Sequence, residues 1–162
     1  MKGGSRKFRA WFPAGLQFLI GLVLFPPASP AQTLSQGQLV YVPIYSHIYY
    51  GDRERTILLT GILSIRNTDP KHPITLLQVE YYNNDGKLLQ KYINQPVTLG
   101  PLGSTRYIVK ASDTAGGSGA NFLVRWKAEK PTNEPIMEGV MIGTSMGQGI
   151  SFTSRGVAIK EK

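Results

Sequence analysis

The stretch DTAGGSGANFLVRW, residues 113–126, contains the residues that most suggest phosphate chemistry, because its glycines would let the backbone approach a ligand closely. A Walker loop, however, ends in Lys followed by Ser or Thr and opens a helix, whose N-terminus holds the phosphate. Here the last glycine leads into a run typical of a strand. The pattern therefore predicts a connection between two strands. Three side chains could still line a small ligand cup on it: Asp113, Ser118 and Asn121.

The segment LVYVPIYSHIYY, residues 39–50, alternates aromatic and aliphatic side chains. The odd positions, which share one face of an extended strand, are Tyr41, Tyr45, His47 and Tyr49. Tyrosine offers apolar area with a hydrogen-bonding tip, so this face would suit a sugar or a protein partner. The alternative is that these tyrosines pack against a neighbouring loop. Pro43 cannot donate to a β-ladder, which predicts that the strand lies at a sheet edge or is bulged.

Three methionines, Met137, Met141 and Met146, raise the possibility of a copper site, because thioethers suit Cu(I). On a straight strand Met137 and Met141 would share a face, but their Cα atoms would lie about 13 Å apart at 3.3 Å per residue. Two sulfurs at that separation can hardly share one ion, so the spacing favours packing methionines and no metal ligand is assigned.

Hydrolysis by nucleophilic catalysis needs a serine close to a histidine and a carboxylate. His47 and His72 are present, but no Gly-x-Ser-x-Gly elbow precedes a helix. Asp52 and Glu54 alternate with arginines in GDRER, which is typical of a salt-bridged turn. The sequence assigns no catalytic residue, and a hydrolase whose site is assembled only by the fold is the third hypothesis for function.

The segment GISFTSRGVAI, residues 149–159, is a strand interrupted at Gly156, a position that suggests a bulge. Arg155 would then stand among hydroxyl groups and could anchor a carboxylate or a phosphate. The alternative is a surface arginine at a strand kink.

Residues 1–31 have the features of an export signal. A positive N-terminal region precedes an apolar stretch of about a dozen residues, 14–25, and small residues at 29 and 31 fit cleavage after Ala31. A bilayer span needs about 20 apolar residues, so we expect a cleaved signal peptide, with an uncleaved membrane anchor as the alternative. A single domain, residues 32–162, would then be periplasmic or secreted, with membrane contact only through the signal before cleavage.

The composition narrows the function further. There is no cysteine, so the chain has no disulfide and no thiolate ligand or nucleophile. Four of the 18 basic residues belong to the signal, which leaves 14 against 10 acidic residues, or +4. The remaining basic residues are scattered, so nucleic acid is not an expected partner.

Period-two alternation in segment after segment predicts an all-β fold. In residues 56–67 one face carries Ile57, Leu59, Leu63 and Ile65, and in 121–128 one face carries Phe122, Val124, Trp126 and Ala128. In 74–82 the pattern places Leu77, Val79 and Tyr81 on one face. Asn84-Asp85-Gly86 predicts a hairpin with a type I′ turn. We expect an immunoglobulin-like antiparallel β-sandwich of about 7–9 strands, with a small β-barrel as the alternative.

The order of five motifs along the chain resembles that of a known family. The motifs are SIRNTD, VEYYNNDGKLL, LGPLGSTRYIV, GGSGANFLVRW and GISFTSRG. Over residues 36–160 the chain resembles a bacterial family, domain of unknown function 3124, often seen in cyanobacteria. The resemblance implies an exported, all-β domain of the immunoglobulin-like type. It implies no particular activity, ligand or catalytic residue.

The sequence therefore predicts an exported, non-catalytic binding module that needs no cofactor. Its expected partner is another protein of the bacterial envelope, contacted through the tyrosine face with help from the glycine loop or Arg155. A periplasmic protein that binds a small ligand or copper is the alternative.

Overall fold

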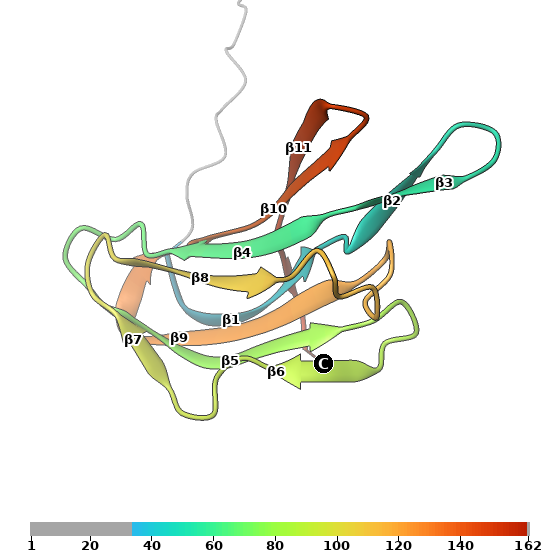
Figure 1. Ribbon diagram of the computed structural model, residues 1–162. Coiled ribbons are helices and arrows are strands. Elements are labelled where there is room, and N and C mark those ends of the chain that lie inside the picture. Colours follow the sequence, from blue (N-terminus) through green and yellow to red (C-terminus); the bar gives the residue numbers. More distant parts are fainter. Residues whose placement is uncertain (1–33, 162) are drawn as a thin grey trace, which may run out of the picture. The chain divides into compact units, whose positions relative to one another are not determined.

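The computed structural model describes residues 34–161, and in this range every regular element is a strand (Figure 1). The described residues contain no helix that could cross a membrane. The strands are β1 (Leu34–Pro43), β2 (His47–Tyr50), β3 (Arg55–Leu58), β4 (Thr60–Arg66), β5 (Ile74–Tyr82), β6 (Leu88–Lys91), β7 (Val97–Leu99), β8 (Ser104–Val109), β9 (Asn121–Asn133), β10 (Ile136–Ser145), β11 (Gln148–Arg155) and β12 (Val157–Ile159).

The strands pair antiparallel in three sheets. The first sheet has the order β12-β1-β9-β5-β6, with β7 also paired to β5; the second has the order β11-β10-β4-β8. These two sheets form two layers, with β1, β9 and β5 below β4 and β8 in Figure 1. The third sheet is the hairpin β2–β3. The sandwich prediction is confirmed, and the sheets remain open rather than closing into the alternative barrel. The described strands number twelve, more than expected, because bends divide segments such as residues 39–50.

The core lies between the two layers and follows the alternation in the sequence. Leu63 and Ile65 of β4 face Phe122, Val124 and Trp126 of β9, and all five are buried. Alternate side chains of each strand thus point into one shared apolar interior, which is the arrangement that period-two patterning predicts.

Strand β5 contains an irregularity that the sequence pattern did not reveal. The register with β9 shifts between Leu76 and Gln78, so that Leu77 is the extra residue of a β-bulge. The bulge changes the phase of the alternation: Leu76 and Val79 are buried, whereas Leu77 is 37% exposed. The prediction that Leu77 shares the buried face of Val79 and Tyr81 is therefore wrong.

The hairpin between β5 and β6 is present, but its turn differs from the expected type. Gly86 has φ of 74° and its N–H donates to the carbonyl of Asn83 at 3.0 Å. Asp85 has no positive φ, so the turn is not type I′. The glycine alone supplies the left-handed residue, as in a turn that ends in a glycine bulge.

Gly156 is the point at which the chain passes from the second sheet, in β11, to the first sheet, in β12. Its N–H donates to the carbonyl of Met137 at 2.8 Å. A Cβ atom at this position would lie 2.8 Å from Val40 Cγ1, so only glycine allows the strand to cross this close to β1. The predicted bulge is thus a crossing between layers.

Candidate functional site

The glycine loop between β8 and β9 is bonded to the rest of the protein. The N–H of Gly117 donates to Ser46 Oγ at 3.0 Å, and the N–H of Ser46 donates back to the carbonyl of Gly117 at 3.1 Å. The N–H of Gly119 donates to Asn84 Oδ1 at 2.7 Å. The backbone donors that a phosphate would require at these two glycines therefore already have protein partners.

The glycines of this loop also answer packing requirements. Gly116 is buried over the Tyr81 hydroxyl, and a Cβ atom there would lie 1.8 Å from that oxygen. Gly117 has φ of 83°, a conformation that favours glycine. These contacts favour the interpretation of the loop as a connection.

The three side chains singled out on the loop lie in different surroundings. Asp113 accepts the N–H of Ala115 at 3.0 Å and lines a shallow cleft with Tyr92. Ser118 is half-buried. Asn121 begins β9, where it is paired with β1 and β5 and is only 8% exposed.

The tyrosine segment is not one straight strand. β1 ends at Pro43, and the N–H of Ile44 donates to the carbonyl of Ala120 at 3.0 Å as the chain turns toward β2. Residues 39–41 pair with β12 on one side and with β9 on the other, in continuous register, so the prediction of an edge or a bulge is wrong for this part of β1. Pro43 lies beyond the residues that pair with β12. Within the described residues no strand on that side needs the backbone N–H that proline lacks.

The bend separates the four residues expected on one face. Tyr41 lies on the first sheet, opposite Leu123. Tyr45 packs edge-on against Phe152 of β11, with ring centroids 5.6 Å apart. Only His47 and Tyr49 meet: the His47 Nε2 and Tyr49 hydroxyl oxygen are 2.9 Å apart. Two residues of the predicted face thus lie together on the hairpin β2–β3.

The hairpin β2–β3 has one face toward the protein and one toward solvent. Ile57 is buried against the core, and Ile48 packs beside it. On the other face, His47 is paired with Leu58 and Tyr49 lies beside it along β2. Tyr49 is 54% exposed and Leu58 is 45% exposed, so the hairpin presents aromatic and aliphatic area to solvent.

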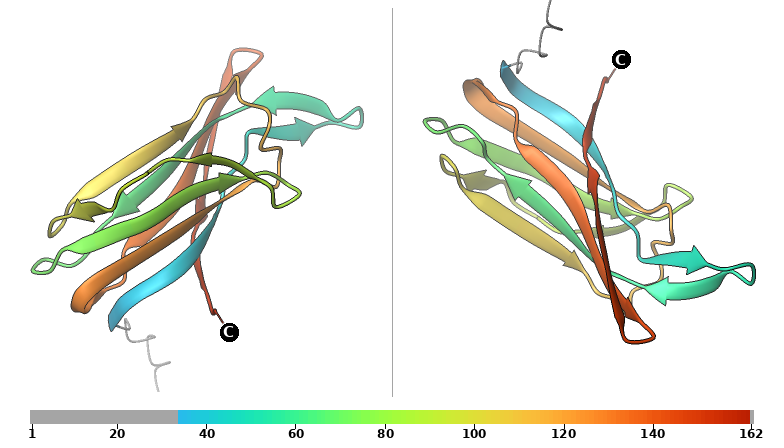
Figure 2. Two further views of the ribbon diagram at one scale, coloured as in Figure 1. Left: turned by 90° about the horizontal axis from the view of Figure 1, so that it is seen from below. Right: turned by 90° about the horizontal axis from the view of Figure 1, so that it is seen from above.

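A cleft of about 520 Å³ lies between this hairpin and the far end of β10. Pairing between β10 and β4 ends at Ile142 and Thr60, whereas β10 and β11 remain paired as far as Ser145. Figures 1 and 2 show the two hairpins, β2–β3 and β10–β11, diverging from this point. Ile142 is 46% exposed at the cleft, next to Thr56–Leu58 of β3.

The methionines do not gather at one place. Met137 and Met141 are both buried on the inner face of β10, as the alternation predicts, and belong to the core. Met146 is exposed at the turn between β10 and β11. Among residues 34–161, no group of three or more His, Asp or Glu side chains is arranged to hold a metal ion.

Each histidine has local partners. His47 Nδ1 is 3.1 Å from Ser46 Oγ, but that hydroxyl is buried and donates to the Gly117 carbonyl. His72 Nδ1 is 3.2 Å from Asp69 Oδ1.

Asp69 is a buried carboxylate that holds three backbone N–H groups. It accepts the backbone N–H groups of Lys71 and His72, both at 2.8 Å, and of Asn133 at 3.1 Å. These bonds lower the pKa of Asp69 from 3.8 to about 2, and the bond from the Lys71 N–H has the largest effect. The carboxylate thereby fixes the turn between β4 and β5 to the end of β9.

The sequence reasoning missed two groups of residues. Leu58 and Ile142 belong to the cleft, but they lie 84 positions apart and only the pairing of β4 with β10 brings their strands together. Arg66 and Arg106 are neighbours on the outer face of the second sheet, through the pairing of β4 with β8. Arg155 lies on the same sheet, exposed and paired with Glu138. No local motif signals either group.

Comparisons with known proteins place the chain in a family. The profile described as "Protein of unknown function (DUF3124)" matches residues 37–159, and the chain belongs to this family. A solved structure, described as the crystal structure of Thermotoga maritima 1070, is similar with a TM-score of 0.45 and 11% sequence identity. The similarity covers 76% of this chain and 93% of that one. No curated protein matches the chain.

Proposed function

We propose that this member of the DUF3124 family is an exported, non-catalytic binding module of the bacterial envelope. It binds an extended segment of another envelope protein in the cleft between its two diverging hairpins. The observation that supports this most directly is the cleft of about 520 Å³ bounded by β3 on one side and β10 on the other.

The cleft offers apolar anchor points of the kind that binding surfaces use. Leu58 and Ile142 are each close to half exposed, and Tyr49 extends the same surface with its ring. The Tyr49 hydroxyl is held by His47, which reduces the number of rotamers that the ring must lose on binding. Aromatic and aliphatic anchors in a pocket carry most of the energy of typical interfaces.

The strand edges give a reason to expect an extended partner. Within the described residues, no strand pairs with Gly143–Ser145 on the side away from β11, and none pairs with β3 on the side away from β2. An extended peptide can add to such edges through main-chain hydrogen bonds, while alternate side chains enter a pocket. The consecutive residues of β3 and β10 that line the cleft fit this mode.

The location in the envelope rests on the sequence. The signal predicted for residues 1–31 lies outside the residues that the structure describes. A domain with a substantial core and no cysteine needs no disulfide after export.

Site-specific photo-crosslinking in the chain's own host tests the proposal. A photoreactive residue replaces Thr56 in the full-length chain, and the cross-linked partner is identified by mass spectrometry. The substitution pair Tyr49→Ala and Leu58→Ser is expected to abolish the cross-link. These side chains are exposed, so the fold should be retained; Tyr45 is left intact because it packs on Phe152.

The matched control is the pair Leu77→Ser and Leu88→Ser, which removes exposed leucines from the first sheet. We expect the control to form the same cross-link to the same partner as the unmodified chain. A cross-link that survives the hairpin substitutions, or one lost equally in both pairs, would contradict the proposed site.

A further inference from the structure

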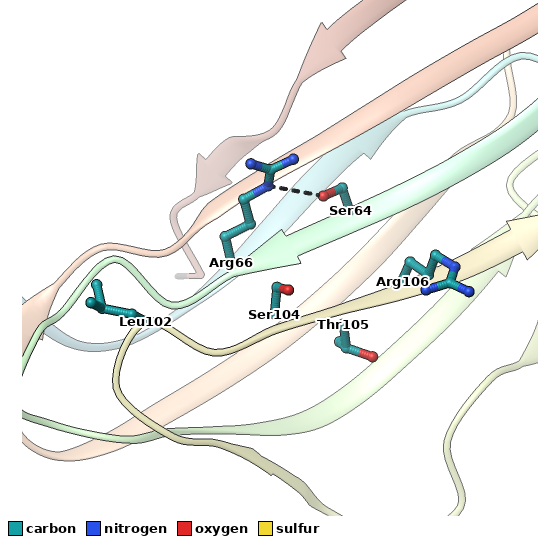
Figure 3. A pocket seen from close by; sticks show the side chains of 6 residues that line it. All are labelled: Ser64, Arg66, Leu102, Ser104, Thr105 and Arg106. Carbon is teal, nitrogen blue, oxygen red and sulfur yellow. Dashed lines mark hydrogen bonds between the residues drawn. The ribbon is translucent and has the colours of Figure 1, made fainter.

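The outer face of the second sheet carries an arrangement of arginines and serines where β4 meets β8. Ser64 is paired with Arg106, and Arg66 is paired with Ser104. Each arginine therefore has a serine opposite it on the neighbouring strand and another serine two residues away on its own strand. Side chains two residues apart on a strand share a face, which puts all four on the same surface. They line a cleft of about 370 Å³, shown in Figure 3.

The arginines of this cleft lack a carboxylate. In the described part of the chain, Arg66 and Arg106 form no ion pair within 4 Å; Arg66 Nε donates only to Ser64 Oγ, at 3.3 Å. Arg125 shows the contrast, since both of its terminal nitrogens donate to Glu161, at 2.6 and 2.7 Å. Arg66 and Arg106 are diagonal neighbours on the two strands, and a bound anion would offset the repulsion between their positive charges.

The cleft also contains the hydroxyl groups that an anion needs. Ser64 lies between the guanidinium groups of Arg66 and Arg106, and Ser104 lies between the two strands (Figure 3). Leu102, at the end of the cleft, is exposed and has φ of 56°, which is unusual for leucine. An anion over Ser64 would meet two positive groups and hydroxyl donors at once.

We infer that this cleft is a binding site for a tetrahedral oxyanion, such as a phosphate group. Two guanidinium groups and two hydroxyls can each donate to a different oxygen of a tetrahedral anion, whereas a carboxylate has only two oxygens. Glu138 of β10 is paired with Ser64 and is, within the described chain, the one acidic residue paired with these four residues, so its negative charge would repel the anion. This inference is independent of the partner site between the hairpins.

Inorganic phosphate is the probe for the test, with acetate at equal ionic strength as the carboxylate comparison. Backbone amide shifts of the purified, isotope-labelled protein are followed by NMR during each titration. We expect saturable shifts in residues 64–66 and 104–106 with phosphate, and weaker binding of acetate. An exposed charge contributes about a 1.5- to 5-fold change in affinity, so Arg66→Gln and Arg106→Gln should each weaken phosphate binding by about that factor.

Two further substitutions separate a site from general charge attraction. Glu138→Gln keeps both arginines and is expected to tighten phosphate binding, by about 1.5- to 5-fold. Arg53→Gln removes an exposed arginine from the distant turn between β2 and β3 and should leave binding unchanged. Shifts that never saturate, or equal effects of Arg53→Gln and Arg106→Gln, would overturn the inference. Phosphate binding that is unchanged by Glu138→Gln, Arg66→Gln and Arg106→Gln would overturn the inference as well.

Discussion

The glycine loop and the hairpin end differ in how their polar and apolar groups are used. In the loop, the N–H groups of Gly117 and Gly119 are bonded to side chains of the protein itself. At the hairpin end, Tyr49 and Leu58 are about half exposed, and within the described residues β3 and the last residues of β10, Gly143–Ser145, are each paired on one side alone. The glycine loop, whose sequence suggests a phosphate site, thus has donors that are already hydrogen-bonded within the protein. Exposed side chains and unpaired strand edges, rather than a glycine-rich composition, identify the better candidate site.

The largest effect on stability is expected from Gly116→Ala. The new Cβ atom would lie 1.8 Å from the Tyr81 hydroxyl oxygen, and both residues are buried, so strand β5 or the loop must shift. Overpacking of this kind costs about 3 kcal/mol. Gly149→Ala is the control at the hairpin end, where nothing lies within 4 Å of the added atom. Urea unfolding of both variants measures the contrast, and equal losses would refute the account of the loop.

Ser46→Ala should have the next largest effect. The Ser46 hydroxyl accepts the N–H of Gly117 and is buried, so its removal leaves a buried donor without a partner. Such a loss costs about 2 kcal/mol. Ser151→Ala, at an exposed position of β11, is the control and should change the unfolding free energy by less than about 0.5 kcal/mol. A stable Ser46→Ala variant would show that the loop is not held by this contact.

Asp69 extends the comparison to the turn between β4 and β5 and predicts a pH dependence. Its folded-state pKa of about 2 lies below its ordinary value of 3.8, so the unfolded state takes up the proton first. The stabilisation is fully present above about pH 4 and is lost as the pH falls toward 2. Asp69→Asn should therefore differ most from the unmodified protein near pH 6, and the difference in thermal midpoint should narrow on acidification. A constant difference would contradict this role.

The smallest effect on stability is expected at the hairpin end itself. Tyr49→Ala and Leu58→Ser remove exposed side chains, so each should change the free energy of unfolding by about 0.5 kcal/mol or less. Chemical denaturation checks this. A loss of several kcal/mol from either change would mean that the hairpin surface is structural and would remove the distinction from the glycine loop.

The sequence was a good guide where one strand's alternation decided the outcome. The buried faces of β4 and β9, the buried pair Met137 and Met141, and the sandwich itself followed from period-two patterning. It failed at Leu77, because a bulge depends on the register with β9 and leaves no mark in the local pattern.

The candidate sites were harder to predict because they depend on pairing between distant segments. His47 and Tyr49 are two positions apart on one strand, so their proximity could be foreseen. The bend between β1 and β2 separates them from Tyr41, and the chain there is bonded from Ile44 to Ala120, 76 residues away. The cleft beside Ile142 and the neighbouring arginines on β4 and β8 likewise require the sheet order.

The most direct test of the account is amide hydrogen exchange of the protein, alone and with the partner identified by cross-linking. Binding of the partner in the cleft should slow exchange in residues 47–58 and 142–146. Exchange in the glycine loop, residues 113–120, should be the same with and without the partner, because its bonds to Ser46 and Asn84 are already made. Protection gained in the glycine loop, with none at the hairpins, would contradict the account.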